Sequence, residues 1–513
     1  MIRARWGPSA CVAASLIGLI AWSCWQRWQL LSASPFPLGV DGYFYPIELR
    51  SLLEHGRLHY PASPLAFYLL APFAAASDPI TGAKLGAAVL GAAIAGPAYG
   101  AGARLGKSRG AGLVAAALAT TSLGSAYLTI EFVKNSIGLT VALTALWLWL
   151  SAADRPTWPR IAAALAGLLA AYATHKMAAA IVLSVAIPAT LAAGHARGVL
   201  RGRRMVWALG GLGLFAAGAL AIGAWFPQRF LSAADAHLMG GLVSANPRWS
   251  APALVFPDGE LALGHDALAG LVLALAWVIA YPWRARIARV IPARCRLEAV
   301  PTPAAVTAAA WPIVVLAIAI GLPFLAVTDR QGLGFRLRIA AFVPAALTAA
   351  IVARAVLARF AHRDAVLAAL ALALALGRRP GPQITGQIVT HPALVTAALA
   401  LSGHVPAGAT LIVPERHIAF LVAWYTRADI ALRPDGIPPA QRYRLLPLHF
   451  IGEGSPLDRQ LLAARAEPSL EPPLGVHPLH PNGLVLVAEP TWAWILDHLP
   501  APDRAYYAAW PTS

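Results

Sequence analysis

The stretch "YLTIEFVKNSIGLTVALTALWLWL", Tyr127 to Leu150, places Glu131, Lys134 and Asn135 at the beginning of an otherwise apolar run. From residue 135 to residue 152 the chain is close to the length of roughly 20 residues that crosses a bilayer. Ionisable groups at membrane depth are costly, so charges at the end of a span need a structural or functional reason. The stretch therefore predicts a transmembrane helix with a polar layer at one end.

The rest of the chain is built in the same way. It has 513 residues, of which 58% are hydrophobic and 12% are charged, whereas soluble domains carry about 25% charged residues. Repeated apolar runs predict an α-helical polytopic membrane protein with about eleven transmembrane helices. The formal net charge is +17, but the basic residues lie mostly in short loops between apolar runs. Membrane orientation explains that pattern, and the absence of a basic groove interleaved with aromatic residues argues against nucleic-acid binding.

The basic loops orient the chain. Cytoplasmic loops of membrane proteins carry an excess of Lys and Arg. The loops assigned to that side contain Arg104, Lys107, Arg109, Arg155, Arg160, Arg197, Arg201, Arg203, Arg204, Arg284, Arg286, Arg289, Arg294, Arg296, Arg354, Arg359 and Arg363. They fall on one side only if the run 64–76, which is too short for a comfortable span, does not cross the membrane. We therefore expect a multi-pass membrane protein with a cytoplasmic N-terminus. Its first hydrophobic run is expected to be retained as a signal anchor, and the alternative is cleavage after Ser34.

Two regions are predicted by this topology. A transmembrane domain covers residues 1–377, with outer loops at 28–81 and 227–266. Residues 378–513 change in composition, because Pro, Asp, Glu and His become frequent. There "ATLIVPE", "RYRLLPLHFI" and "GLVLVAE" are typical of strands, and "HIAFLVAWYTRADI" and "TWAWILDHL" of helices. The tail is therefore expected to form a small extracytoplasmic α/β domain.

Asp41 lies in the first outer loop, within "VDGYFYPIELRSLLEHGRLHYP" (Val40 to Pro61). Asp-Gly is turn chemistry, so the carboxylate could bond backbone amides before a helix opened by Pro46. That helix is amphipathic and is expected at the membrane surface. The alternative is that Asp41 is a general base or a metal ligand.

Glu131 is predicted in the same extracytoplasmic layer as Asp41. If the segment is helical, Glu131, Lys134 and Asn135 share a face, and an ion pair between Glu131 and Lys134 is the structural alternative. The functional alternative is that two converging carboxylates share a divalent cation, or that one removes a proton from an acceptor hydroxyl.

Further cations are predicted at the outer level. His175 and Lys176 interrupt a long apolar stretch in "YATHKMAA", where the histidine is either a hydrogen-bonded packing residue or a ligand. Arg330 and Arg336 lie in "TDRQGLGFRLRIAAF" and either reach lipid phosphates or grip a substrate phosphate. Most of the few lysines fall on this outer side, which suits a phosphate or pyrophosphate group.

These features together resemble the GT-C superfamily of polyprenyl-phosphate-sugar-dependent integral membrane glycosyltransferases, which includes protein O-mannosyltransferases and aminoarabinose transferases. The resemblance rests on "GVDGYFYPIELRSLLEHGRLHYPASPLAFYLLAPF", on "YLTIEFVKNSIGLTVALTALWLWL" and on the order of spans and outer domain. It implies that Asp41 is the first-loop acid, that Glu131 is the second-loop acid, and that Arg330 or Arg336 binds the donor phosphate. The pattern also departs from the family, because Gly42 and Tyr43 follow Asp41 and leave no DxD pair. The tail lacks a WWD-like motif, which argues against asparagine-directed oligosaccharyl transfer.

With this resemblance, the sequence predicts a membrane glycosyltransferase that moves a sugar from a polyprenyl-phosphate-linked donor to an acceptor hydroxyl on the extracytoplasmic face of a bacterial plasma (inner) membrane. The acceptor would be a glycan, a lipid or a protein. Asp41 and Glu131 are the expected catalytic acids and possible ligands of Mg²⁺ or Mn²⁺. The expected substrate-binding residues are Lys134, His175, Lys176, Arg330 and Arg336. The alternatives are a transporter or flippase of a lipid-linked substrate and a non-catalytic membrane assembly partner.

Overall fold

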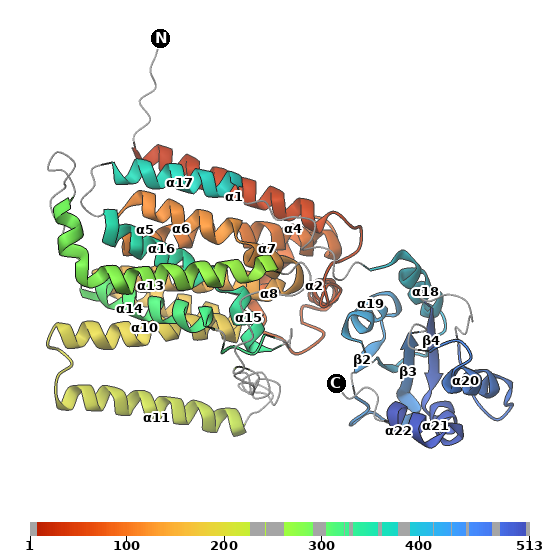
Figure 1. The fold of residues 1–513 in the computed structure, drawn as a ribbon. Coiled ribbons are helices and arrows are strands. Elements are labelled where there is room, and N and C mark those ends of the chain that lie inside the picture. Colours follow the sequence, from red (N-terminus) through yellow and green to blue (C-terminus); the bar gives the residue numbers. More distant parts are fainter. Residues whose placement is uncertain are drawn as a thin grey trace, which may run out of the picture. The chain divides into compact units, whose positions relative to one another are not determined.

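The structure is a computed structural model of the whole chain. It describes residues 8–225, 242, 261–290, 304–322, 324–327, 332–357, 362–377, 390–413, 415–431, 433–447, 451–474 and 483–508. The chain divides into two compact units (Figure 1). The first comprises Met1–Leu30, Ser63–Ala66 and Ala87–Ile384, and the second comprises Leu31–Ala62, Phe67–Gly86 and Thr385–Ser513.

The first unit is a bundle of apolar helices. Its helices are α1 (Pro8–Leu31), the second half of α4 (Pro79–Ala92), α5 (Ala95–Gly106), α6 (Arg109–Thr121), α7 (Leu123–Glu131), α8 (Val133–Asp154), α9 (Trp158–Thr174), α10 (Lys176–Ala196), α11 (Arg203–Trp225), α13 (Leu261–Val290), α14 (Ala304–Gly321), α15 (Leu333–Ile339), α16 (Phe342–Leu357) and α17 (Arg363–Gly377). A large core of Ala, Leu, Val and Ile side chains joins α5, α6, α8, α10, α14 and α16. The small alanine side chains let these helices approach closely, as is common between helices in membranes.

Four helical segments of the described chain are long and apolar enough to cross a membrane: Pro79–Gly106, Val133–Asp154, Lys176–Ala196 and Gly264–Trp283. Two bent pairs raise the number to six if each is one span, Arg109–Thr121 with Leu123–Glu131 and Leu333–Ile339 with Phe342–Leu357. The predicted spans near 82–102, 135–152, 177–193, 267–283 and 337–354 coincide with these segments. The number of about eleven is not confirmed by them.

The run 64–76 contains a short helix, α3 (Leu65–Ala75), with Pro72 inside it. Eleven residues at 1.5 Å each span about 16 Å, roughly half the thickness of a hydrocarbon core. The chain then turns back, and the start of α4 packs directly against the end of α3. A Cβ added at Gly82 would lie only 2.3 Å from the Cα of Ala74. This geometry agrees with the prediction that the run is too short to span.

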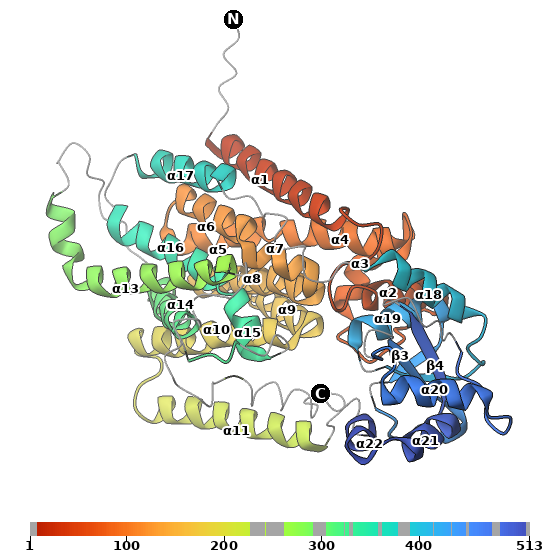
Figure 2. The same ribbon diagram turned by 45° about the vertical axis from the view of Figure 1, so that its right-hand side comes forward.

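The second unit contains a four-stranded sheet of order β2-β1-β3-β4, and Figure 2 shows its strands β3 and β4. Its strands are β1 (Thr410–Ile412), β2 (Asp429–Ala431), β3 (Arg442–Pro447) and β4 (Leu484–Ala488), and β1 is parallel to β2 and β3 whereas β4 is antiparallel to β3. Its helices are α2 (Phe44–His55), most of α3, the start of α4, α18 (Pro392–Ser402), α19 (Arg416–Thr426), the 3-10 helix η4 (Pro439–Gln441), α20 (Pro456–Ala466), α21 (Glu489–His498) and α22 (Ala501–Ala508). One core of this unit gathers around Trp492 of α21 and the buried residues of β3 and β4.

The tail therefore contains the expected mixture of strands and helices, with one difference. The helix predicted over "HIAFLVAWYTRADI" ends at Thr426, because Arg427 adopts a left-handed conformation with φ 58°. The residues after it form β2 instead, paired in register with β1. The alternation of apolar residues across that stretch fits a helix and a short strand equally well, so periodicity alone did not separate them.

Candidate functional site

Two broken helices meet in the first unit. The α6–α7 pair bends by 45° at Ser122, and the α15–α16 pair bends by 42°. The contact is tight, because a Cβ added at Gly124 would lie 2.3 Å from the carbonyl oxygen of Ile339. Nearby, the rings of Tyr127 and Phe335 meet edge to face with centroids 6.2 Å apart. The absence of a side chain at residue 124 is therefore what brings the two bends together.

The bend at Ser122 is held by polar contacts in an apolar core. The Ser122 hydroxyl oxygen accepts from the Ser125 backbone N–H at 3.2 Å, which caps α7. The same hydroxyl makes a short hydrogen bond to the carboxylate of Asp266 on α13, and both side chains are buried. Buried polar groups without partners would cost several kcal/mol in lipid, roughly 2–7. This bond therefore stabilises the bend.

Arg338, on α15, is the most unusual side chain at this junction. It is fully buried, and its Nη2 donates to the carbonyl oxygen of Leu322 at 2.8 Å. Its Nε and Nη1 have no hydrogen-bond partner, and no carboxylate pairs with it anywhere in the part of the chain that the structure describes. Within the described residues this buried guanidinium therefore has one neutral acceptor and no compensating negative charge. The junction is therefore suited to an anion.

Glu131 and Arg336 approach the same residue from two helices. Glu131 is buried at the end of α7, and Phe132 separates it from α8. The Arg336 guanidinium carbon lies 4.9 Å from the centroid of the Phe132 ring, a cation–π geometry. Arg336 and Arg338 are two positions apart on α15, so they point to different sides of that helix. Arginine charge thus flanks the end of α7 in the described structure.

The chain between Glu131 and Lys134 is not one continuous helix. Phe132 has φ −135° and ψ 62°, which ends α7 and allows α8 to begin at Val133. The shared helical face on which the sequence analysis placed Glu131, Lys134 and Asn135 is therefore divided between two helices. Sequence periodicity could not show this break, because Phe132 and Val133 are both apolar and continue the apolar pattern across it.

His175 lies at a second break, between α9 and α10. Its Nδ1 accepts from the Met177 backbone N–H at 3.2 Å and so caps α10, which Lys176 begins. This bond leaves the proton of a neutral imidazole on Nε2. The break packs against α8, since a Cβ added at Gly138 would lie 3.1 Å from the His175 Cβ. Gly138 lies one helical turn after Lys134 on α8. The structure therefore brings the break at His175 close to the first turns of α8, where Lys134 lies.

Asp41 belongs to the second unit, where its carboxylate forms an ion pair with Arg416 of α19. Asp41 Oδ1 lies 2.9 Å from Arg416 Nε, although the contact lacks the alignment of a hydrogen bond. The turn is closed by main-chain bonds, from Gly42 N–H to the oxygen of Gly39 and from Phe44 N–H to the oxygen of Asp41. Helix α2 has no side-chain cap. The capping alternative for Asp41 is therefore not what the structure shows.

Other contacts join the first loop to α19 within the second unit. Arg50 donates to the backbone oxygen of Trp424 at 3.0 Å and lies 4.3 Å from the centroid of its ring. Burial lowers the pKa of Arg50, and the nearby Arg427 lowers it further. The hydroxyls of Tyr43 and Tyr425 are 3.3 Å apart. Most of α2 is thus buried in this unit, where the sequence analysis expected a helix lying at the membrane surface.

A buried carboxylate and two buried phenols complete the loop. Glu48 accepts from the backbone N–H groups of His59 and Tyr60 at 2.8 and 2.9 Å. Burial raises the pKa of Tyr60, with a further increase from the charge of Asp429. Burial also raises the pKa of Tyr43, assisted by its hydrogen bond with Tyr425. These groups hold the loop in one conformation.

The predicted site residues therefore divide into three sets. Glu131 and Arg336 lie around Phe132, while Lys134, His175 and Lys176 lie around the start of α8. Asp41 is in the other unit, so a carboxylate pair formed with Glu131 stays a prediction. Arg330 lies outside the described residues, as does most of the outer loop 227–266. Among the described residues there is no group of three or more His, Cys, Asp or Glu side chains that could hold a metal ion.

Two residues of the junction were not assigned from the sequence. Arg338 was visible as a second arginine in an apolar run, but its burial depends on α15 packing against α14. Asp266 showed no ligand spacing, and its role follows only from its contact with Ser122, 144 residues away. No local pattern reports such a contact.

No protein-family model matches this chain, and no curated protein matches it. Among solved structures, the fold is similar to that of an oligosaccharyltransferase from Archaeoglobus fulgidus, solved as a complex with Zn and sulfate. The TM-score is 0.44 at 12% sequence identity, and the match covers 80% of this chain and 62% of that chain. The chain therefore spans less than two thirds of the length of that structure, and a likeness of this size assigns no activity.

Proposed function

We propose that this protein is a membrane glycosyltransferase that takes a sugar from a polyprenyl-phosphate-linked donor and transfers it to an acceptor hydroxyl on the extracytoplasmic face. The observation that carries the proposal is the buried guanidinium of Arg338 at the junction of two bent helices, which no carboxylate of the described residues neutralises. A phosphate ester that enters from the lipid would supply the missing negative charge and accept the unused N–H groups. Guanidinium groups bind phosphate through paired, charge-assisted hydrogen bonds.

The location of the junction supports a lipid-linked substrate. Both bent pairs are apolar enough to count as spans, so the site is within a membrane-embedded bundle. Irregular backbone at membrane depth is tolerated only where it is buried in protein or lines a cavity. Arg336 and Lys134 add further cations near the end of α7, and neutralising the departing phosphate would be the main electrostatic contribution to catalysis.

The chemistry proposed is an inverting substitution at the anomeric carbon. The acceptor oxygen forms the new bond to that carbon while the bond to the donor phosphate breaks, and polyprenyl phosphate leaves with the electron pair. A carboxylate removes the acceptor proton. Asp41 remains the base predicted from the sequence. Glu131 is proposed to orient the site, with or without Mg²⁺ or Mn²⁺.

The test is glycan transfer in membranes that contain Asp41→Asn, Glu131→Gln or Arg336→Gln variants. Loss of a contact to developing charge typically costs about 10²–10³ in rate. Arg160→Gln is the matched control, since it removes one arginine of the same bundle away from the junction. Full activity of all three site variants, with normal insertion, would refute the proposal.

A second function, transport of a lipid-linked substrate, is favoured by one observation. Discontinuous helices that meet inside a bundle are typical of transporter binding sites, and α6–α7 and α15–α16 form such a pair. The two functions differ in their product. A transporter returns the lipid-linked sugar unchanged on the other leaflet, whereas a transferase releases polyprenyl phosphate and a glycosylated acceptor.

A further inference from the structure

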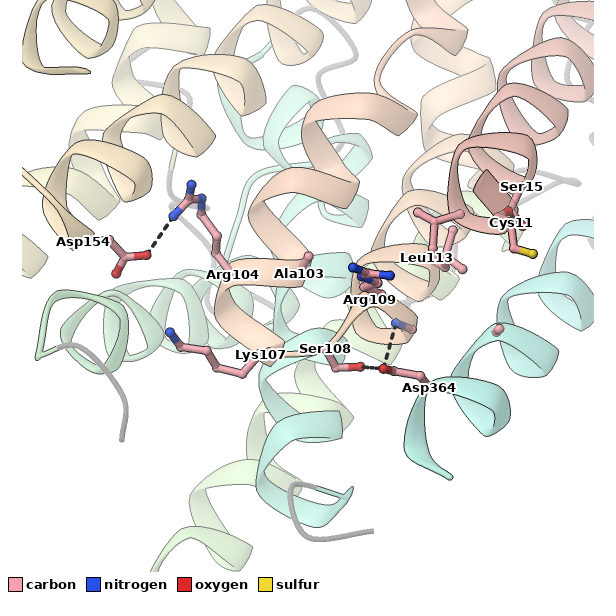
Figure 3. Close-up of a pocket in the computed structure, with 13 residues that line it drawn as sticks. Cys11, Ser15, Ala103, Arg104, Lys107, Ser108, Arg109, Leu113, Asp154 and Asp364 are labelled. Atoms are coloured by element: carbon pink, nitrogen blue, oxygen red, sulfur yellow. Dashed lines mark hydrogen bonds and ion pairs between the residues drawn. The ribbon is translucent and has the colours of Figure 1, made fainter. Parts of the chain in front are cut away.

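A cavity with charged residues in its lining lies at the opposite end of α6 from the Ser122 bend. Its volume is about 660 Å³, and it opens to the surface between α1, α5, α6, α8 and α17 of the first unit (Figure 3). It lies where the arginine distribution predicts the cytoplasmic side. Its lining residues are Cys11, Val12, Ser15, Ala103, Arg104, Lys107, Ser108, Arg109, Gly110, Leu113, Asp154, Asp364 and Ala368.

The two carboxylates in this cavity are already occupied. Asp154 forms an ion pair with Arg104 at 2.8 Å. Asp364 accepts from the Ser108 hydroxyl in a short hydrogen bond and from the Gly110 backbone N–H at 3.1 Å (Figure 3). Asp364 thereby ties the start of α17 to the start of α6. Asp154 is thus paired with a cation, whereas the partners of Asp364 are both neutral donors.

The remaining cations of the cavity are Lys107 and Arg109. Neither side chain has an ion pair or a hydrogen bond with any described residue. Three basic and two acidic side chains line the cavity, so its net formal charge is +1. With Arg104 compensated by Asp154, the two positive charges of Lys107 and Arg109 exceed the one negative charge of Asp364.

The backbone at Lys107 is unusual for a residue with a side chain. Its φ is 50° and its ψ is 37°, the left-handed region that glycine usually occupies after a helix. The conformation is fixed on both sides, because the Lys107 N–H bonds the oxygen of Ala103 and the Lys107 oxygen accepts from Arg363 at 3.0 Å. A left-handed non-glycine residue costs of order 1–3 kcal/mol. A lysine at this position is therefore a costly way to end α5 unless its ammonium group is used.

We propose that this cavity binds the phosphate group of a phosphate ester, which the positive charges of Lys107 and Arg109 attract. The apolar wall formed by Val12, Leu113 and Ala368 suits the glycerol and upper acyl chain of an anionic phospholipid, and basic pockets between transmembrane helices on the cytoplasmic side bind such headgroups. A free phosphate offers the same group without the apolar part. This site is independent of the proposed transfer reaction, because it lies at the other end of α6.

Cys11 gives a direct measurement, since it lines the cavity and is exposed. In the full-length protein with Cys24→Ser and Cys295→Ser, the rate of Cys11 alkylation by a maleimide is followed in detergent. Short-chain phosphatidylglycerol, phosphatidylcholine and inorganic phosphate are titrated separately. We expect phosphatidylglycerol to slow the alkylation at a lower concentration than phosphatidylcholine does.

Two variants and a control make the test specific. Lys107→Gly removes the ammonium group while keeping a residue that accepts the left-handed backbone, and Arg109→Gln removes the other cation. Each is expected to raise the protecting concentration about fivefold, the effect of one Lys or Arg near an anionic headgroup. Arg203→Gln, at the exposed start of α11, is expected to leave it unchanged.

The three ligands distinguish the sources of phosphate. Protection by phosphatidylglycerol alone identifies a lipid headgroup, and protection by inorganic phosphate at the same concentration identifies a soluble phosphate. The proposal is overturned if no ligand protects Cys11, or if Lys107→Gly and Arg109→Gln retain the wild-type protecting concentration. The melting temperature of Lys107→Gly is also expected to be unchanged or higher, since a loss of protection with a lower melting temperature would indicate a structural role.

Discussion

Gly124→Ala tests the contact between the two bent helices of the first unit. The added Cβ would lie 2.3 Å from the carbonyl oxygen of Ile339 and 3.4 Å from a ring carbon of Phe342. A backbone oxygen cannot rotate away, so α7 or α15 must shift. Overpacking of this kind costs about 1–3 kcal/mol, which outweighs the gain of up to about 1 kcal/mol from replacing glycine by alanine in a helix.

The assay is thermal unfolding of the purified full-length protein in detergent, followed by tryptophan fluorescence. A loss of 1–2 kcal/mol in a unit of this size lowers the melting temperature by a few degrees. Gly210→Ala is the matched control, because no atom lies within 4 Å of a Cβ added there, in the middle of α11. It is expected to leave the melting temperature unchanged or to raise it. If Gly124→Ala behaves like Gly210→Ala, the two bends are not in contact and the junction around Arg338 loses its framework.

Three predictions concern the second unit. In a double-mutant cycle, Asp41→Asn and Arg416→Gln should show a coupling of about 0.5–1 kcal/mol in the free energy of unfolding. The coupling is small because Arg416 is about half exposed, and solvent weakens the ion pair. Additive effects of the two changes would show that the ion pair does not form. Glu48→Gln should cost about 1–3 kcal/mol, since the amide can accept only one of the two backbone N–H groups well, and a change below 0.5 kcal/mol in denaturant unfolding would contradict the contact. Burial raises the pKa of Tyr43 and Tyr60 in the folded state. Above pH about 10 the unfolded state therefore loses these phenolic protons while the folded state keeps them. The free energy of unfolding should then fall by about 1.4 kcal/mol per pH unit for each tyrosine. Replacing either tyrosine by phenylalanine should reduce that slope by one such increment, and an unchanged slope would show that the phenol is not protected.

The spans and the strands could be predicted because they depend on local patterns. An apolar run of about 20 residues predicts a membrane helix whatever surrounds it, and "GLVLVAE" predicts a buried strand from its branched side chains. The positions of Glu131, Lys134 and His175 at helix ends followed from the same reasoning. Each of them lies beside a helix break in the structure.

The contacts that give those residues their roles could not be predicted in this way. Asp41 pairs with Arg416, 375 positions later, and both the cap and the catalytic readings of Asp41 were made without that partner. Arg338 and Arg336 lie on different sides of α15, and only the packing of α15 in the folded chain determines that Arg338 is fully buried. The break at Phe132 depends on backbone angles that apolar residues adopt under tertiary constraint. Long-range packing, which leaves no periodic signature, decides all three.

The central claim is that Arg338 holds the phosphate of a lipid-linked donor. Arg338→Met replaces the guanidinium by a long apolar side chain and so removes a buried charge that has one neutral partner among the described residues. Removing such a charge should leave the melting temperature of the ligand-free protein unchanged or raise it. The same change should weaken the binding of polyprenyl phosphate.

The decisive measurement is therefore the affinity of the purified protein for polyprenyl phosphate, compared between the wild type, Arg338→Met and the control Arg160→Gln. A charged hydrogen-bonding partner of phosphate contributes about 1.5–3 kcal/mol, so we expect the affinity of Arg338→Met to fall by roughly 10- to 100-fold. The control should bind as the wild type does. Equal affinity of Arg338→Met and the wild type, or a large fall in the melting temperature of the ligand-free variant, would show that Arg338 is a structural residue and would contradict the claim.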